Sequence, residues 1–184
     1  PLPQGQHELY VISLHFHESG SLAGLTLWPE ETLNLPTPLG PAMARNGASF
    51  YEDGALRSFE PAAPWAIDTP IGRIEAFDPD PEGISGDLGS VSFGPDGRLL
   101  RLCSGSDSVT VEQPVGPSRT FAPDAKAGLC DEGDEASAPL SIAFEPGRVL
   151  LGPKAEAFSL ADCRFTVARG PRQLIPIAFP CAEG

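Results

Sequence analysis

Hydrophobic and polar positions along the chain repeat in a seven-residue pattern, Phe-x-x-(Asp/Ser)-Gly-x-Leu. The copies are residues 16–22, 50–56 and 93–99, with a fourth, one residue shorter, at 144–149. A polar centre with glycine between two apolar ends is typical of a three-residue β-hairpin loop, in which glycine takes the left-handed conformation. The pattern therefore predicts four hairpins, each with a buried Phe opposite its Leu or Val. We expect positive φ at Gly20, Gly54 and Gly97.

A second element follows the first three hairpins. It is a Pro-(Leu/Ile/Val)-Gly corner about 20 residues after each hairpin glycine, at 37–40, 69–72 and 113–116. Each unit is therefore a hairpin, a return strand, a variable loop and a corner. The intervals between the Phe residues are 34, 43 and 51 residues, too irregular for a tandem solenoid. We expect a domain derived from repeats, with units at about 10–40, 44–72, 88–121 and 138–170.

The remaining apolar runs are short and either alternate or are continuous. No window shows 3.6-residue periodicity over three turns, and 20 Gly and 21 Pro disfavour long helices. Runs such as Leu99-Leu-Arg-Leu are apolar on both faces, which indicates strands enclosed between layers. The sequence thus predicts one all-β domain, 1–184, forming a β-sandwich or roll with little helix. The expected strands are 10–16, 22–27, 89–93, 99–103, 109–111, 139–144, 149–151, 164–168 and 174–179, with a long surface loop at 123–137.

The chain is strongly acidic, with a formal net charge of −13. Nucleic-acid phosphates and anionic membrane surfaces repel such a chain, so we expect no nucleic-acid partner. No stretch reaches 18 apolar residues, and therefore no membrane span is expected. The simplest role of the charge is solubility.

The four cysteines are Cys103, Cys130, Cys163 and Cys181. None forms a CxxC pair, which disfavours structural zinc. Of the three possible disulfide connectivities we favour Cys103–Cys130 and Cys163–Cys181, above all the second, because runs 164–168 and 174–179 read as an antiparallel pair that brings its flanking cysteines together. Two of the cysteines can instead be small buried residues.

The chain begins with Pro, which either cleavage of a signal peptide or trimming explains. Together with the expected disulfide, this favours an extracytoplasmic location, periplasmic or secreted.

Two groups of residues could bind metal. Asp78, Asp80 and Glu82, followed by Asp87, resemble the start of a calcium loop, although Gly89 stands where its twelfth-position acid belongs. A plain acidic turn is the simpler interpretation. His15 and His17 alternate on a strand and could begin a metal site, but polar residues pointing outward beside a turn are expected in any case.

Candidate binding and catalytic residues are few. Trp28 and Trp65 follow the first two hairpins at similar distances, which predicts a shared packing role or, if both are exposed, a binding patch. The segment 104–107, Ser-Gly-Ser-Asp, supplies hydroxyls, yet the chain contains no G-x-S-x-G motif. No catalytic residue is predicted.

Residues 50–58, Phe-Tyr-Glu-Asp-Gly-Ala-Leu-Arg-Ser, resemble the bacterial variant of the MORN repeat, whose hairpins read aromatic-Tyr-x-Asn-Gly-x-Leu-Lys-Ser. The other three hairpins match its Phe, Gly and Leu/Val positions, so the resemblance covers about 30 residues. It implies β-hairpins and a role in association with proteins or the envelope. The second glycine-bearing half of that repeat is missing here, and the resemblance assigns no functional residue.

The sequence therefore predicts a non-enzymatic binding or structural module, secreted or associated with the envelope, whose partner is a protein or an envelope component. One alternative is a hydrolase or metal-dependent enzyme with scattered site residues. Another is a calcium-stabilised surface protein. An enzyme should have a deep pocket with converging His and carboxylate groups, whereas a module should have a shallow apolar face.

Overall fold

The computed structural model describes residues 8–79, 81, 89–125 and 137–170. Within these ranges the regular secondary structure consists of β-strands, with no helix. The predicted all-β class is confirmed. The strands are β1 Val11–Phe16, β2 Leu22–Leu27, β3 Leu33–Thr37, β4 Gly40–Phe50, β5 Leu56–Pro61, β6 Trp65–Thr69, β7 Gly72–Ala76, β8 Val91–Phe93, β9 Leu99–Ser104, β10 Asp107–Glu112, β11 Arg119–Phe121, β12 Asp124–Ala125, β13 Ser137–Ala138, β14 Leu140–Glu145, β15 Arg148–Leu151, β16 Glu156–Ser159 and β17 Arg164–Arg169.

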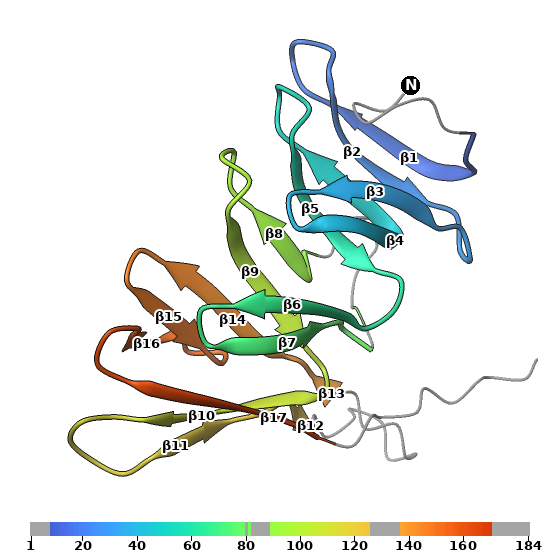
Figure 1. The fold of residues 1–184 in the computed structure, drawn as a ribbon. Coiled ribbons are helices and arrows are strands. Elements are labelled where there is room, and N and C mark those ends of the chain that lie inside the picture. Colours follow the sequence, from blue (N-terminus) through green and yellow to red (C-terminus); the bar gives the residue numbers. More distant parts are fainter. Residues whose placement is uncertain (1–7, 80, 82–88, 126–136, 171–184) are drawn as a thin grey trace, which may run out of the picture.

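One ten-stranded antiparallel sheet dominates the molecule. Its order, β1-β2-β4-β5-β8-β9-β14-β15-β16 with β3 on β4, follows the order of the chain. In Figure 1 it runs as a twisted ribbon from β1 at one end of the molecule to β16 at the other. The smaller sheets are β11-β10-β17, β6-β7 and β12-β13, so the chain leaves the large sheet between β5 and β8 and again between β9 and β14.

The four predicted hairpins are present as β1–β2, β4–β5, β8–β9 and β14–β15. Each Phe lies opposite its predicted partner: Phe16 and Leu22, Phe50 and Leu56, Phe93 and Leu99, Phe144 and Val149. The turn glycines Gly20, Gly54 and Gly97 have φ of 85°, 86° and 76°. Both the turn type and the register are therefore confirmed.

The predicted burial of the aromatic residues is confirmed for three hairpins and wrong for the first. The side chains of Phe50, Phe93 and Phe144 are buried, whereas Phe16 is 60% exposed. Phe16 is exposed because β1 is an edge strand of the large sheet and the hydrophobic core does not extend beneath the end of this strand.

The first two corners are themselves hairpin turns. Thr37 pairs with Gly40 where β3 meets β4, and Thr69 pairs with Gly72 where β6 meets β7. In both turns the threonine hydroxyl donates a 2.6 Å hydrogen bond to the glycine carbonyl oxygen. The third corner lies in the loop between β10 and β11, where Gly116 has a φ of 109°.

The long strand β4 is bent by a bulge. Asn46 has a φ of 61°, and the pairing with β5 shifts between Arg45 and Ala48. Residues before the bulge pair with β3 and residues after it pair with β2, while β5 follows the other edge. A bulge of this kind increases the bend and twist of a strand, which lets β4 join two neighbours on one edge.

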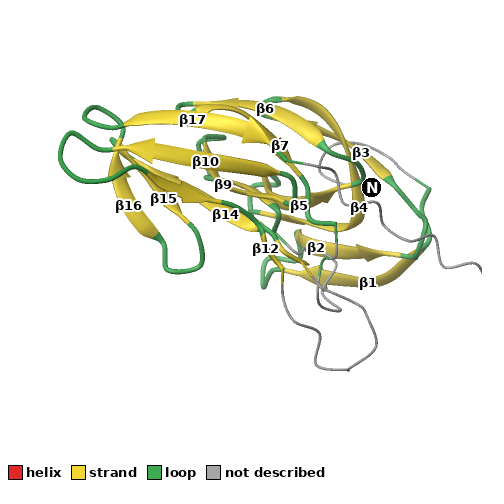
Figure 2. Ribbon diagram, turned by 90° about the horizontal axis from the view of Figure 1, so that it is seen from below, coloured by secondary structure: helices red, strands yellow, loops and turns green. Residues whose placement is uncertain are grey.

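A second layer covers part of the large sheet. Figure 2 shows β6, β7, β10 and β17 lying over β9 and β14. Buried side chains from both layers, including Ile74 of β7, Val109 of β10 and Ile142 of β14, belong to one hydrophobic cluster. This packing buries the second half of β9, residues 102–104, on both faces, whereas Arg101 in the predicted run 99–102 is exposed. Two sheets packed face to face in this way form a sandwich.

The second layer is closed by a long-range strand pair. β17 pairs along its length with β10, from Asp107 opposite Arg169 to Glu112 opposite Arg164. The run 174–179, expected beside 164–168, lies outside the described residues, so that pairing stays a prediction.

Candidate functional site

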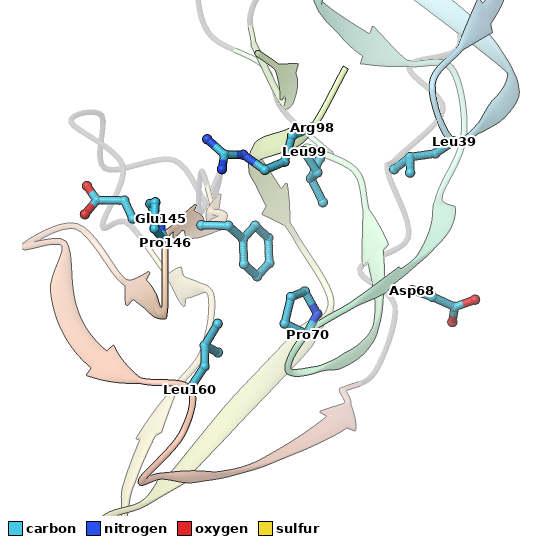
Figure 3. Close-up of a pocket in the computed structure, with 9 residues that line it drawn as sticks. Leu39, Asp68, Pro70, Arg98, Leu99, Glu145, Pro146 and Leu160 are labelled. Carbon is cyan, nitrogen blue, oxygen red and sulfur yellow. The ribbon is translucent and has the colours of Figure 1, made fainter. Parts of the chain in front are cut away.

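The turns of several hairpins converge around one apolar hollow of about 240 Å³ (Figure 3). Turn β3–β4 contributes from one side and turn β6–β7 from below, and the hairpins β8–β9 and β14–β15 supply the rest, together with the residue that follows β16. The hollow is thus a direct product of the two turn motifs. Its lining residues are Leu39, Asp68, Pro70, Arg98, Leu99, Phe144, Glu145, Pro146 and Leu160.

The inner wall of the hollow is apolar. In Figure 3, Leu99 at the start of β9, Pro70 in the β6–β7 turn and Leu160 after β16 point into it. Phe144 is buried and belongs to the hydrophobic core, so the hollow opens directly onto that core. Leu39 is 45% exposed at the rim.

Charged groups stand only at the edge of the hollow. The carboxylates of Asp68 and Glu145 point away from the centre (Figure 3). Glu145 accepts a 2.6 Å hydrogen bond from Nε of Arg148, across the turn of its own hairpin. The edge therefore offers polar contacts to a ligand without placing an unpaired carboxylate inside.

The groups that face the interior of the hollow are apolar, and its two carboxylates, Asp68 and Glu145, stand at the edge. None of the described lining residues is a histidine, cysteine, serine or lysine. Aliphatic, proline and phenyl groups provide dispersion contacts and the removal of apolar surface from water. The hollow can therefore hold an apolar group.

The two tryptophans do not share one packing role. The ring of Trp65 packs against Phe59 with 5.7 Å between ring centroids and adjoins the core. Trp28 is exposed and directly follows β2, and its backbone N–H donates to the carbonyl oxygen of Tyr10, just before β1, at 2.9 Å. Neither residue lines the hollow.

The calcium candidates lie mostly outside the described residues, since of the four only Asp78 is described. Its backbone N–H lies 3.5 Å from Oε1 of Glu60, and its carbonyl oxygen accepts a hydrogen bond from Arg45. In the parts of the chain that the structure describes, no group of three or more His, Cys, Asp or Glu residues could hold a metal ion. A calcium site including Asp80, Glu82 and Asp87 stays a prediction.

The two described histidines are engaged separately. Nε2 of His15 lies 3.3 Å from the Ser13 hydroxyl, and Nε2 of His17 lies 3.1 Å from the Phe50 carbonyl oxygen. His17 therefore ties the first hairpin to the second, which is a structural role.

Sequence reasoning missed a buried carboxylate on β5. Glu60 has no exposed surface, and burial raises its pKa to about 7, opposed by the Ser90 hydroxyl and by Arg45. Nη2 of Arg45 lies 3.5 Å from Oε1 of Glu60, and the Arg45 guanidinium stacks over Phe77 at 4.6 Å. Among the described residues, Oε2 of Glu60 has no hydrogen-bond partner. No hydrophobic pattern marks this position, because Glu60 stands where the strand alternation is already interrupted by the bulge opposite.

A second buried acidic group is well paired. Asp107 accepts a 2.6 Å hydrogen bond from the Glu75 backbone N–H and lies 3.3 Å from Nε of Arg169. Nη1 of Arg169 lies 2.9 Å from Glu75. The Ser104 hydroxyl accepts from the Asp107 N–H at 3.0 Å. The segment 104–107 thus fastens β7, β10 and β17 together, and its hydroxyl and carboxylate groups are used structurally.

The two described cysteines, Cys103 and Cys163, are not bonded to each other, so no disulfide lies within the described residues. Burial raises the pKa of the Cys103 thiol, which favours its neutral form. The expected partners Cys130 and Cys181 lie outside the described residues, so both pairings stay predictions.

The residues of the hollow were present in the motifs, although the motifs did not reveal that they meet. Leu39 and Pro70 come from the corners, and Leu99 and Phe144 are pattern positions of two hairpins. What the sequence lacked was the sheet order that puts these turns on one side.

Nothing among the described residues forms a helix long and apolar enough to cross a membrane. Comparison with protein-family models, with curated proteins and with solved structures gave no match to this chain, so the resemblance of the hairpins to the MORN-variant repeat rests on their residues alone.

Proposed function

We propose that this chain is a non-enzymatic binding module that holds an apolar side chain of a partner protein in the hollow between its hairpin turns. The observation that carries the proposal is an open apolar hollow, built from four hairpins and the residue after β16, whose two lining carboxylates, Asp68 and Glu145, point away from its centre. Turns tolerate change in sequence better than the strands they join, and binding residues are often placed there on a rigid sheet.

The size of the hollow favours one side chain over a larger ligand. Its volume of about 240 Å³ lies below the roughly 300–1,000 Å³ of typical small-molecule sites. A single aliphatic or aromatic group from a partner can fill it, and the edge charges at Arg98, Asp68 and Glu145 are placed to meet the partner's backbone. A location at or beyond the bacterial envelope is part of the proposal and is supported by the resemblance to the MORN-variant hairpins.

The test uses N-acetyl-phenylalanine amide as a probe for an apolar side chain on a peptide backbone. Titration into methyl-labelled protein should shift the methyl resonances of Leu39, Leu99 and Leu160 and leave those of Val115 unchanged. Replacing Leu39 with Ser should weaken the binding at least threefold, because one wall of the hollow is lost.

The matched control is Met43→Ser. Met43 is 47% exposed, close to the 45% of Leu39, and does not line the hollow. This variant should bind the probe as the original chain does. Equal binding by the Leu39→Ser variant, or methyl shifts spread over the whole protein, would contradict the proposal. A pull-down from the native envelope with both variants then asks whether a protein partner depends on Leu39.

A further inference from the structure

The first strand of the large sheet exposes an apolar surface that the proposed site does not use. β1 is the end of the sheet path, and within the described residues it pairs only with β2. Tyr10 is 75% exposed and Ile12 58%, and Leu14 and Phe16 are also exposed. Trp28 lies beside Tyr10 through the hydrogen bond between their backbones. At the end of the molecule where β1 lies (Figure 1), aromatic and aliphatic groups thus gather along an edge strand.

This edge lacks most of the devices that keep edge strands from pairing. Residues 9–16 contain no Lys, no Pro and no acidic residue. The protection that is present consists of two irregularities in the pairing with β2, one between Val11 and Ser13 and one between His15 and Phe16. An edge that is apolar and presents a row of backbone groups is a template for another strand.

The charge of the chain restricts what can pair there. The net charge is −13, yet residues 9–16 carry no formal charge at neutral histidine, with Glu8 and Glu18 just outside the segment. A basic partner would be drawn to the acidic remainder of the surface and not to this strand. The occupant that suits the strand is itself neutral, apolar and extended, and β1 of a second copy has these properties.

The exposed area is sufficient for such a contact. At about 150–250 Å² for a whole aromatic side chain, the exposed fractions of Tyr10, Phe16 and Trp28 leave roughly 300–500 Å² of aromatic surface. The aliphatic groups of β1 bring the patch close to the roughly 600 Å² that each partner contributes to the smallest stable interfaces.

We infer that β1 pairs antiparallel with β1 of a second copy, so that the large sheet continues across a two-fold axis. A symmetric contact of this kind uses the same strand on both subunits and closes after two copies. The inference is independent of the hollow, which lies among the turns of other strands.

The test is the molar mass of the whole chain in solution, measured by sedimentation equilibrium. The chain should be a dimer, and Leu14→Lys should raise the dimer dissociation constant at least tenfold, because it places two like charges in the contact. Leu14 is exposed, so the monomer should keep its fold and melting temperature. The matched control is Val115→Lys, the same change at a residue 86% exposed in the loop after β10, which should remain a dimer.

Hydrogen exchange locates the contact. Backbone amides of residues 11–16 should exchange more slowly as the concentration is raised through the dimerisation midpoint, and those of Asn34 on β3 should not change. A monomeric chain at every concentration, a dimer that survives Leu14→Lys, or a monomer that binds neutral lipid vesicles through β1 would each overturn the inference.

Discussion

The first and third hairpins share a sequence pattern but have opposite environments. Phe16 and Phe93 each stand four residues before a left-handed glycine, and each faces a leucine across the strands. Phe16 is 60% exposed and Phe93 has no exposed surface. The difference arises from sheet position, since β8 lies between β5 and β9 whereas β1 ends the sheet. A local pattern therefore determines a turn and its register, and the rest of the chain determines burial.

The test of this comparison with the largest expected effect removes each of the two rings in a separate variant. Phe93→Ala should lower the free energy of unfolding by about 3–5 kcal/mol, because it leaves a cavity in the core. Phe16→Ala should change it by less than about 0.5 kcal/mol, as an exposed substitution does. Urea denaturation of both variants, made at concentrations where the chain is monomeric, measures the two values. Similar losses for the two would break the comparison.

The second test uses a carboxylate that only the middle of the sheet can bury. The pKa of Glu60 is raised by burial from 4.5 to about 7 in the folded chain. Between these values the unfolded chain has lost the proton and the folded chain still holds it, so the free energy of unfolding should fall as pH rises from 4.5 to 7. At 1.36 kcal/mol per pH unit the full effect is about 3 kcal/mol.

Glu60→Gln should remove this part of the pH dependence, as measured by denaturation at pH 4.5, 6 and 7.5. Below pH 4.5 the original carboxyl is protonated in both the folded and the unfolded chain. Any gain in unfolding free energy of the Gln variant over the original chain should therefore be smallest there and should grow as the pH rises. The control is Glu18→Gln at the exposed turn of the first hairpin, which should keep the original profile. A parallel profile for Glu60→Gln would show that Arg45 holds this carboxylate ionised in the folded chain.

The smallest test separates backbone strain from crowding. A Cβ at Gly20 would meet nothing within 4 Å, whereas a Cβ at Gly97 would approach Cγ of Pro38 at 3.3 Å. Both glycines have positive φ, so alanine at either should cost about 1 kcal/mol of backbone strain. Gly97→Ala should be the more destabilising, since Pro38 lies against Gly97 and no atom lies that close to Gly20. Thermal melts of the two variants compare them, and an equal loss would mean that Pro38 moves aside freely.

Much of the fold could be read from the sequence because turn chemistry is local. The hairpin registers, the glycine conformations and the absence of helix in the described residues follow from the spacing of Phe, Gly and Leu. The long strand β4 could not be predicted in this way, because Gly40–Phe50 contains no β-branched residue. It is held in the sheet by β2, β3 and β5. Its extended form comes from pairing and has no signal in its own composition.

The candidate site could be predicted only in part for a related reason. Its residues belong to recognisable turns, but sequence cannot tell which turns project from the same side of a sheet. The buried pair of Glu60 and Arg45 and the group around Asp107 were hidden altogether, because an isolated charge in a strand is normally exposed. Tertiary packing buries these charged groups, and their own strand sequences do not indicate that burial.

The order of the strands also has a consequence for how the chain folds. Most neighbours in the large sheet are neighbours in sequence, so their contacts can form by closing short loops, at little entropic cost. β10 and β17 are different, because Ser108 pairs with Ala168 across 60 residues. Contacts of such separation slow folding, since the intervening chain must be ordered before they are gained. The large sheet can therefore grow hairpin by hairpin, and the docking of β17 onto β10 is the step that completes the molecule late.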